Sequence, residues 1–316
     1  MPKFFARRLG EAVLVLAVLS ILVFLMVRVM PGDPASAFMD PGNPDPTVRE
    51  RIHEQLGLDQ PWATQYLVWI GGILTGDFGR SLTQPYTVAE QLALRLPVSL
   101  ELGIMATLIG VSLGIPLGIA AARRRGRTFD QGSRALTFFL ISAPPFLLGT
   151  VILLINSRTT RFRLLGFVEF SEDPVQHFLK LLLPAFLLSL GTLALVARYT
   201  RGMLLDTFGQ DYIRTARAKG IAPDRIVRSH ALRNALAPVV TIIGVQLATL
   251  VGGTIIMENV FALPGMGSML IQAVNTSDYT TIQACVLIIG AMYVGISLVV
   301  DLVYPLIDPR IRMVRA

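Results

Sequence analysis

The sequence holds few side chains that could carry out chemistry, and their spacing does not suggest catalysis or metal binding. Its only cysteine, Cys285, lies in an apolar run, and its three histidines, His53, His177 and His230, fall in three separate predicted loops. Zinc and redox sites need Cys and His ligands at close spacing. No Gly-rich loop ending in Gly-Lys-Ser/Thr is present to bind nucleotide phosphates. We therefore expect no catalytic residue, no metal, no cofactor and no ATP hydrolysis in this chain.

Three acidic residues, Glu101, Glu258 and Asp301, lie in or beside apolar runs. A charged group is costly in lipid unless it faces protein or water. These residues are therefore candidates either for a transport pathway or for structural ion pairs. Glu101 and Asp301 lie near the ends of their runs, which favours structural pairing.

The composition is that of a membrane protein. Of the 316 residues 53% are hydrophobic and 16% are charged, and the mean hydropathy is +0.61, whereas a soluble domain carries about 25% charged residues. A helix needs roughly 20 mostly apolar residues to cross a bilayer. Six such runs predict an all-α polytopic membrane protein with six transmembrane helices. They cover residues 9–29, 98–122, 135–155, 179–197, 235–257 and 282–307.

Basic residues gather on one side of these predicted spans. Loops rich in Arg and Lys resist translocation and stay in the cytoplasm, and both termini and the loops after the second and fourth spans are basic. The segment 31–96, on the other side, has four Arg against eight carboxylates. Both termini are therefore predicted to be cytoplasmic, in an inner or plasma membrane. The net charge of +7 is spread over several loops, which argues against nucleic-acid binding.

The segment 31–96 is predicted to form a small helical collar outside the membrane. Thr-Val-Arg-Glu at 47–50 and Thr-Val-Ala-Glu at 87–90 fit capping boxes, and residues 61–74 predict a helix with Trp62, Tyr66 and Trp69 near the membrane surface. The collar is either a passive lid or a docking surface for an external partner. The predicted division of the chain is a first span (1–30), the collar (31–96), a five-helix core (97–307) and a cytoplasmic tail (308–316).

Glycine and proline mark the helices of the core. Gly110, Gly114 and Gly118 recur at every fourth residue, so one helix face lacks side chains and another helix can approach closely. Proline removes a backbone donor and permits a kink. Such prolines stand at 116, 144, 145, 184 and 238.

The loop between the fourth and fifth spans, residues 207–237, is hereafter the basic loop. Its pattern predicts two short amphipathic helices: Tyr212, Ile213 and Ala216 line the first, Gly220 ends it, and Pro223 begins the second. A soluble partner could bind such a pair of helices, or the pair could lie on the surface of anionic lipid. Its candidate contact residues are Tyr212, Arg214, Ala216, Arg217, Lys219, Gly220, Arg228, His230, Arg233 and Asn234.

The basic loop resembles the cytoplasmic signature of ATP-binding-cassette importer permeases, which reads Glu-Ala-Ala, three residues, Gly, nine residues, Ile-x-Leu-Pro. Ala216, Gly220 and Leu232 match this general form. Ala-Arg-Ala-Lys-Gly at 216–220 and His-x-Leu-Arg-Asn-Ala at 230–235 resemble the peptide and nickel importer branch. Further segments that resemble the first permease subunit of dipeptide and oligopeptide importers lie at 30–34, 56–61, 76–81, 258–267 and 308–310.

This resemblance implies the type I importer permease fold and a set of partners. An external substrate-binding protein would deliver di- or oligopeptides, a second related permease would complete the pathway as a heterodimer, and cytoplasmic subunits would bind ATP and Mg. The basic loop would then be the coupling element that docks in the ATPase. Nickel, glutathione and other small solutes remain alternative cargoes.

Two other classes of function are weighed against this one. A gradient-driven secondary transporter would usually show internal repeats and ion ligands buried in the membrane, and no convincing duplication is seen. An intramembrane hydrolase needs its reacting groups at one depth, whereas Glu101 and Asp301 are expected near opposite faces. Both rivals predict activity from this chain alone.

Overall fold

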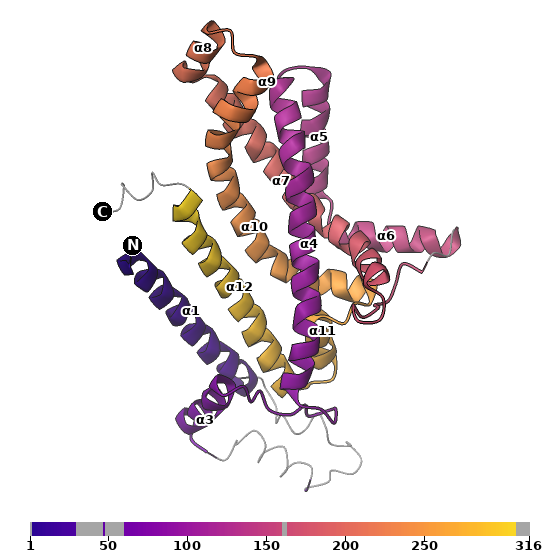
Figure 1. Ribbon diagram of the computed structural model, residues 1–316. Helices are drawn as coiled ribbons and strands as arrows, with labels where there is room; N and C mark the ends of the chain where they lie inside the picture. The colour runs from indigo at the N-terminus through magenta and orange to yellow at the C-terminus, as the bar shows by residue number, and fades with distance from the viewer. Residues whose placement is uncertain (1, 30–46, 48–59, 160–162, 308–316) are drawn as a thin grey trace. The chain divides into compact units, whose positions relative to one another are not determined.

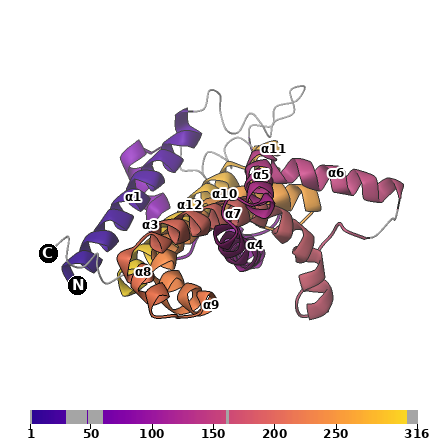
Figure 2. The same ribbon diagram turned by 90° about the horizontal axis from the view of Figure 1, so that it is seen from above.

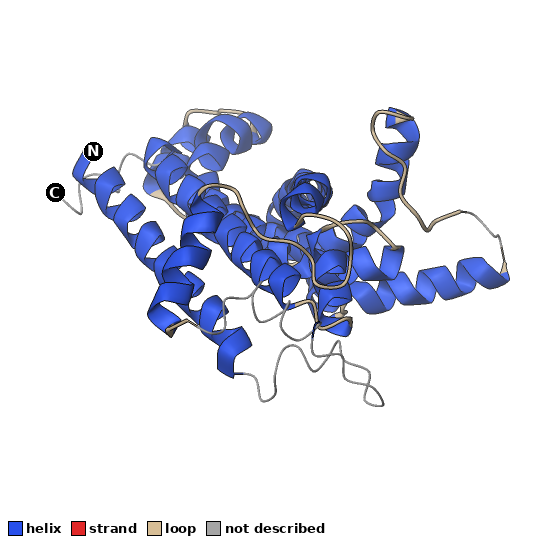
Figure 3. Ribbon diagram, turned by 90° about the horizontal axis from the view of Figure 1, so that it is seen from below, coloured by secondary structure: helices blue, strands red, loops and turns tan. Residues whose placement is uncertain are grey.

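The computed structural model describes residues 2–29, 47, 60–159 and 163–307, and these residues form helices and loops without a strand (Figure 3). Long apolar runs favour helices because a helix satisfies its own backbone hydrogen bonds where water is absent. The helices are α1 (Pro2–Val29), α3 (Trp62–Leu74), α4 (Val88–Arg123), α5 (Thr128–Ser142), α6 (Pro145–Arg158), α7 (Pro174–Phe208), α8 (Asp211–Ala218), α9 (Pro223–Arg225), the π-helix η2 (Ile226–Ala231), α10 (Leu232–Phe261), α11 (Met266–Asn275) and α12 (Tyr279–Ile307).

Within these residues, four helices are long and apolar enough to cross a membrane, and up to seven spans result if each bent helix pair counts as one. The chain divides into two compact units. The first comprises Met1–Ser99 and Pro264–Val294, and the second comprises Leu100–Leu263 and Gly295–Ala316. Helices α4 and α12 run from one unit into the other.

The third predicted span, residues 135–155, is wrong as a single helix. The structure has α5 and α6 in its place, bent by 89° to each other (Figure 1). Ala143 and Pro144 adopt extended backbone, and Pro145 occupies the first turn of α6. Two consecutive prolines remove two backbone donors, so the helix ends before them and starts again in a new direction.

The first unit is held by a small apolar core and by one buried carboxylate. Val88, Met266 and Cys285 belong to a cluster of buried side chains contributed by α4, α11 and α12. Asp278, 1% exposed, accepts hydrogen bonds from Ser81 Oγ at 2.5 Å and from Thr281 Oγ1 at 2.7 Å. These bonds fix the segment after α3 to the start of α12.

The helix predicted over 61–74 and the capping box at 87–90 are confirmed. Helix α3 is present, and the rings of Tyr66 and Trp69 lie 6.2 Å apart. At the start of α4, Thr87 N donates to Glu90 Oε2 and Glu90 N donates to Thr87 Oγ1, both at 3.4 Å. The motifs at 30–34 and 308–310 lie outside the described residues, as does most of the box at 47–50 and of the motif at 56–61.

The second unit is built around α7, which packs against α4, α5, α6 and α10. Asp173 begins α7 by accepting from the amides of Val175 and Gln176 at 3.0 Å. Pro184 lies inside α7, where much of the helix surface is buried. From above, α6 leads away from the other helices of this unit (Figure 2).

Candidate functional site

The basic loop is compact, and its first helix forms as predicted. Helix α8 follows α7 and is closed by Gly220, whose φ is +75°. Ile221 N donates to Ala216 O at 3.2 Å and Gly220 N donates to Arg217 O at 2.9 Å. This bond pair is the Schellman motif, which needs a left-handed residue and therefore favours Gly. Space is free where a Cβ would lie, so backbone conformation accounts for this Gly.

The second predicted helix of the basic loop is not separate. Pro223 occupies the first turn of α9 as expected, but α9 continues through η2 directly into α10. A π-helical turn inserts an extra residue per turn and often occurs at functional sites. The chain therefore stays helical from α9 into α10, and it bends by 52° between Leu236 and Pro238.

Buried side chains join the basic loop to the ends of the long helices. Ile213 and Ala216 on α8 belong to one apolar cluster with Leu204 of α7, Ile226 and Ala231, each no more than 5% exposed. Fully burying a large aliphatic side chain contributes about 1.5–3 kcal/mol. The loop is therefore a packed extension of α7 and α10.

The outer surface of the basic loop is polar and mostly basic. Tyr212 and Asn234 are exposed, and Asn234 Nδ2 donates to Tyr212 Oη at 3.0 Å, which ties α8 to α10. Arg214 pairs with Asp211 at 3.3 Å. Five further basic side chains are exposed and form no ion pair with a described residue: Arg217, Lys219, Arg225, Arg228 and Arg233.

A concave surface lies beside the basic loop, with a volume of about 790 Å³. Phe208, Ile221 and Val227 contribute apolar lining, and Arg125 and Arg217 contribute positive charge. An apolar floor with a basic rim is suited to a protein segment that presents apolar and acidic side chains.

An ion pair and a half-buried histidine lie at the same end of the second unit. Arg123, at the end of α4, forms an ion pair with Asp224 of α9. His230 lies in η2, half-buried, and its Nδ1 is buried without a hydrogen-bond partner in the described part of the chain. The ion pair therefore joins the end of α4 to the basic loop.

The structure places the three predicted glycines of α4 against α7. A Cβ on Gly110 would lie 2.9 Å from Thr192 Cβ, one on Gly114 would lie 2.8 Å from the carbonyl of Leu193, and one on Gly118 would lie 2.5 Å from that of Ala197. Real Cβ contacts almost never fall below 3.0 Å. The two backbones therefore approach as closely as they do because side chains are absent.

The stretch 110–114 reads Gly-Val-Ser-Leu-Gly, the residue order of a nucleophile elbow. An elbow requires a sharp strand-to-helix turn. Ser112 instead lies inside α4, and its hydroxyl donates to the carbonyl of Ile109 at 3.1 Å. The pattern therefore serves helix packing and does not present a nucleophile.

Sequence reasoning missed a buried ion pair between α5 and α7. Arg201 Nε lies 2.6 Å from Asp130 Oδ1, Arg201 Nη2 lies 2.8 Å from Oδ2, and the amide of Gly126 donates to Oδ2 at 3.0 Å. Asp130 is 1% exposed. The available signal was a single acidic residue within the Arg-rich segment 123–134.

Glu101 pairs with His177, whose Nε2 lies 2.8 Å from Glu101 Oε2 while its Nδ1 lies 2.8 Å from Val168 O. The prediction that His177 lies in a loop is wrong, because it lies in the first turn of α7 among the rings of Phe167, Phe170 and Phe178. Glu258 is fully buried in α10, and both Glu258 and Asp301 have interaction partners.

Comparisons with known proteins agree over nearly the whole chain. A family model described as "Binding-protein-dependent transport system inner membrane component" matches residues 114–313, and the model of its N-terminal part matches residues 1–103. A protein of Brucella abortus (strain 2308) named as a peptide transport system permease is 37% identical over 313 residues, covering 99% of each chain. The dipeptide transport system permease protein DppB of Escherichia coli (strain K12) is 35% identical over 336 residues, covering 99% of each chain.

One solved structure has a similar fold. It is an inward-facing form of the MetNI methionine ABC transporter, with a TM-score of 0.52 and 20% sequence identity. The match covers 69% of this chain and 96% of the matched chain.

Proposed function

The chain belongs to the family of binding-protein-dependent transport system inner membrane components, and on that premise we propose that it is the membrane-spanning permease of an ATP-driven importer of di- or oligopeptides. The observation that carries this proposal is the full-length similarity, at 35–37% identity, to permeases named for peptide or dipeptide transport. Nickel, glutathione and other small solutes are the alternative cargoes.

The basic loop is the proposed contact with the ATPase subunits. Its exposed arginines and Lys219 would meet acidic side chains, and the concave surface beside it would receive an apolar segment of the partner. Movement of the ATPase would pass through α9 and η2 into α10, and through the shared apolar cluster into α7. Gly220, Ala216 and Tyr212 shape this contact.

We further propose six spans with both termini in the cytoplasm, the third span being the bent pair α5 and α6. The segment 31–96 would then lie outside, where a substrate-binding protein docks, ahead of a core over 97–307 and a cytoplasmic tail over 308–316. A second related permease would form the other half of the pathway. Glu101, Glu258 and Asp301 act in this arrangement as structural pairing groups, and support for this comes from the His177 contact and the burial of Glu258.

Reconstituted transport tests the proposal. The chain is co-expressed with the neighbouring permease, ATPase and binding-protein genes, and the complex is placed in liposomes that contain ATP. We expect uptake of a labelled dipeptide that requires both ATP and the binding protein, with labelled nickel and glutathione as matched cargoes. Uptake by this chain alone, driven by an ion gradient, would refute the proposal.

A further inference from the structure

A pocket between α4, α5 and α7 lies apart from the basic loop and has no part in the proposed drive contact. Its volume is about 750 Å³. Small residues on α4 and α7 contribute to its lining, namely Gly118, Ala121 and Ala197. The lining residues lie within 117–121 on α4, 131–141 on α5 and 197–201 on α7.

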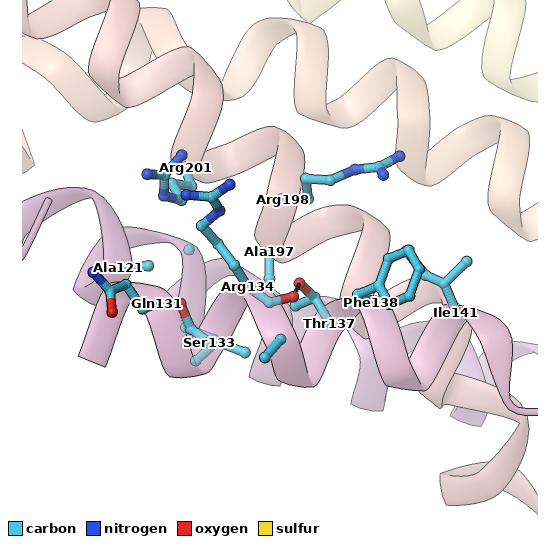
Figure 4. A pocket seen from close by; sticks show the side chains of 13 residues that line it. Ala121, Gln131, Ser133, Arg134, Thr137, Phe138, Ile141, Ala197, Arg198 and Arg201 are labelled. Carbon is cyan, nitrogen blue, oxygen red and sulfur yellow. Dashed lines mark hydrogen bonds between the residues drawn. The ribbon is translucent and has the colours of Figure 1, made fainter. Parts of the chain in front are cut away.

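One end of the pocket carries more positive charge than the chain itself neutralises. Figure 4 shows Arg134 extending from α5 toward Arg201 of α7, while Arg198 of α7 extends in the other direction, on the side of Phe138. Arg201 is held by Asp130, whereas Arg134 and Arg198 are exposed and form no ion pair with a residue that the structure describes. Arg134 and Arg201 thus share this end with one carboxylate, and Arg198 adds a third guanidinium to the pocket lining. An anion would compensate the excess.

The other end of the pocket is apolar. Phe138 and Ile141 of α5 and Leu117 of α4 line it, and Phe138 is 75% exposed. At a rise of about 1.5 Å per residue, the seven residues from Arg134 to Ile141 span roughly 10 Å along α5. On α5 the lining therefore changes from basic at Arg134 to apolar at Phe138 and Ile141, as the chemistry of a phospholipid does from phosphate to acyl chain.

Two buried hydroxyls add a preference among headgroups. Ser133 donates to the carbonyl of Asp130 at 2.9 Å and Thr137 donates to that of Arg134 at 3.0 Å. Their hydrogens are thereby engaged, and only their oxygen lone pairs remain for a ligand. Such oxygens accept a hydrogen bond from a hydroxyl group, which a glycerol headgroup has and a choline headgroup lacks.

We propose that this pocket binds one anionic phospholipid with a polyol headgroup, of the phosphatidylglycerol class. The phosphate lies between Arg134 and Arg198, the headgroup hydroxyls meet Ser133 and Thr137, and an acyl chain follows Phe138. A free phosphate has no apolar part that could contact the apolar end of the pocket. The inference needs only the membrane location of the chain and is independent of which solute is carried.

Native mass spectrometry of the purified complex tests the site with two probes, phosphatidylglycerol and phosphatidylcholine of the same acyl chains. We expect one phosphatidylglycerol that phosphatidylcholine does not displace. Each Arg near an anionic headgroup contributes modestly, so the double variant Arg134→Gln/Arg198→Gln is expected to bind it roughly thirtyfold more weakly. The matched control, Arg124→Gln/Arg127→Gln, removes the same charge from the loop before α5 and is expected to change affinity less than about threefold.

Three results would overturn the proposal: equal loss of affinity in the control, displacement of the lipid by soluble glycerol 3-phosphate, or a partner-subunit segment cross-linked to position 138 in the intact complex. The single variant Arg198→Gln serves if the double variant does not assemble, with roughly fivefold weaker binding expected. Unchanged affinity in this single variant would equally reject the site.

Discussion

The close contact between α4 and α7 yields a quantitative prediction for Gly118→Ala. The added Cβ would lie 2.5 Å from the carbonyl oxygen of Ala197 and 2.7 Å from Thr200 Cβ. Backbone atoms cannot rotate away, so the helices must separate by several tenths of an ångström. Overpacking of this kind costs about 1–3 kcal/mol, while replacing Gly by Ala within a helix restores about 1 kcal/mol.

Gly103→Ala in the same helix is the matched control, because nothing lies within 4 Å of the position of its Cβ. The difference between the two variants cancels helix propensity and isolates the contact. We expect Gly118→Ala to be less stable than Gly103→Ala by about 2 kcal/mol. The apparent free energy of unfolding is measured by SDS titration in mixed micelles. Equal stability of the two variants would refute the close packing of α4 on α7.

Three further predictions concern the basic loop and its supports. Gly220→Val forces a β-branched residue to φ +75°, at about 1–2 kcal/mol, and should abolish most substrate-stimulated ATP hydrolysis in the assembled complex. Retention of normal stimulation would contradict the coupling role. Asp130→Ala leaves Arg201 without its buried partner and should destabilise the chain by about 3 kcal/mol in thermal melts. The double variant Asp130→Ala/Arg201→Met should recover part of this stability. A larger loss of stability in the double variant would contradict the pairing. Arg123→Gln breaks a solvent-exposed pair with Asp224 and should cost less than about 1 kcal/mol in the same melts, so a large loss would show that the pair is buried in the complex.

Local features of the sequence were sufficient to predict much of the second unit. The Gly110, Gly114 and Gly118 spacing predicted a bare helix face, and Gly220 predicted the end of α8, because both depend on neighbours along the chain. The partner of the bare face could not be predicted, since α7 lies about 80 residues away. The same distance in sequence hid the pairing of Asp130 with Arg201, which are separated by 71 residues.

The features that were predicted wrongly or missed from the sequence have separate physical causes. The Pro144-Pro145 pair was recognised as a site for a kink, but the 89° bend that results depends on what α6 packs against. Helix α11 was missed because ten residues are too few for the search for membrane-length runs. The start of α7 could have been found, since Asp173 followed by Pro174 is an N-cap with Pro in the first turn, and His177 would then have been placed correctly.

The central claim is that this permease is driven through the basic loop by an ATPase subunit. Photo-cross-linking tests it most directly, with a photoreactive amino acid in place of Lys219 in the assembled complex and, as control, in place of Leu67 on α3. We predict that the probe at 219 cross-links to the ATPase subunit, in an amount that changes when ATP is bound, and that the probe at 67 does not. Cross-links from position 219 to lipid alone, with the complex intact, would contradict the claim.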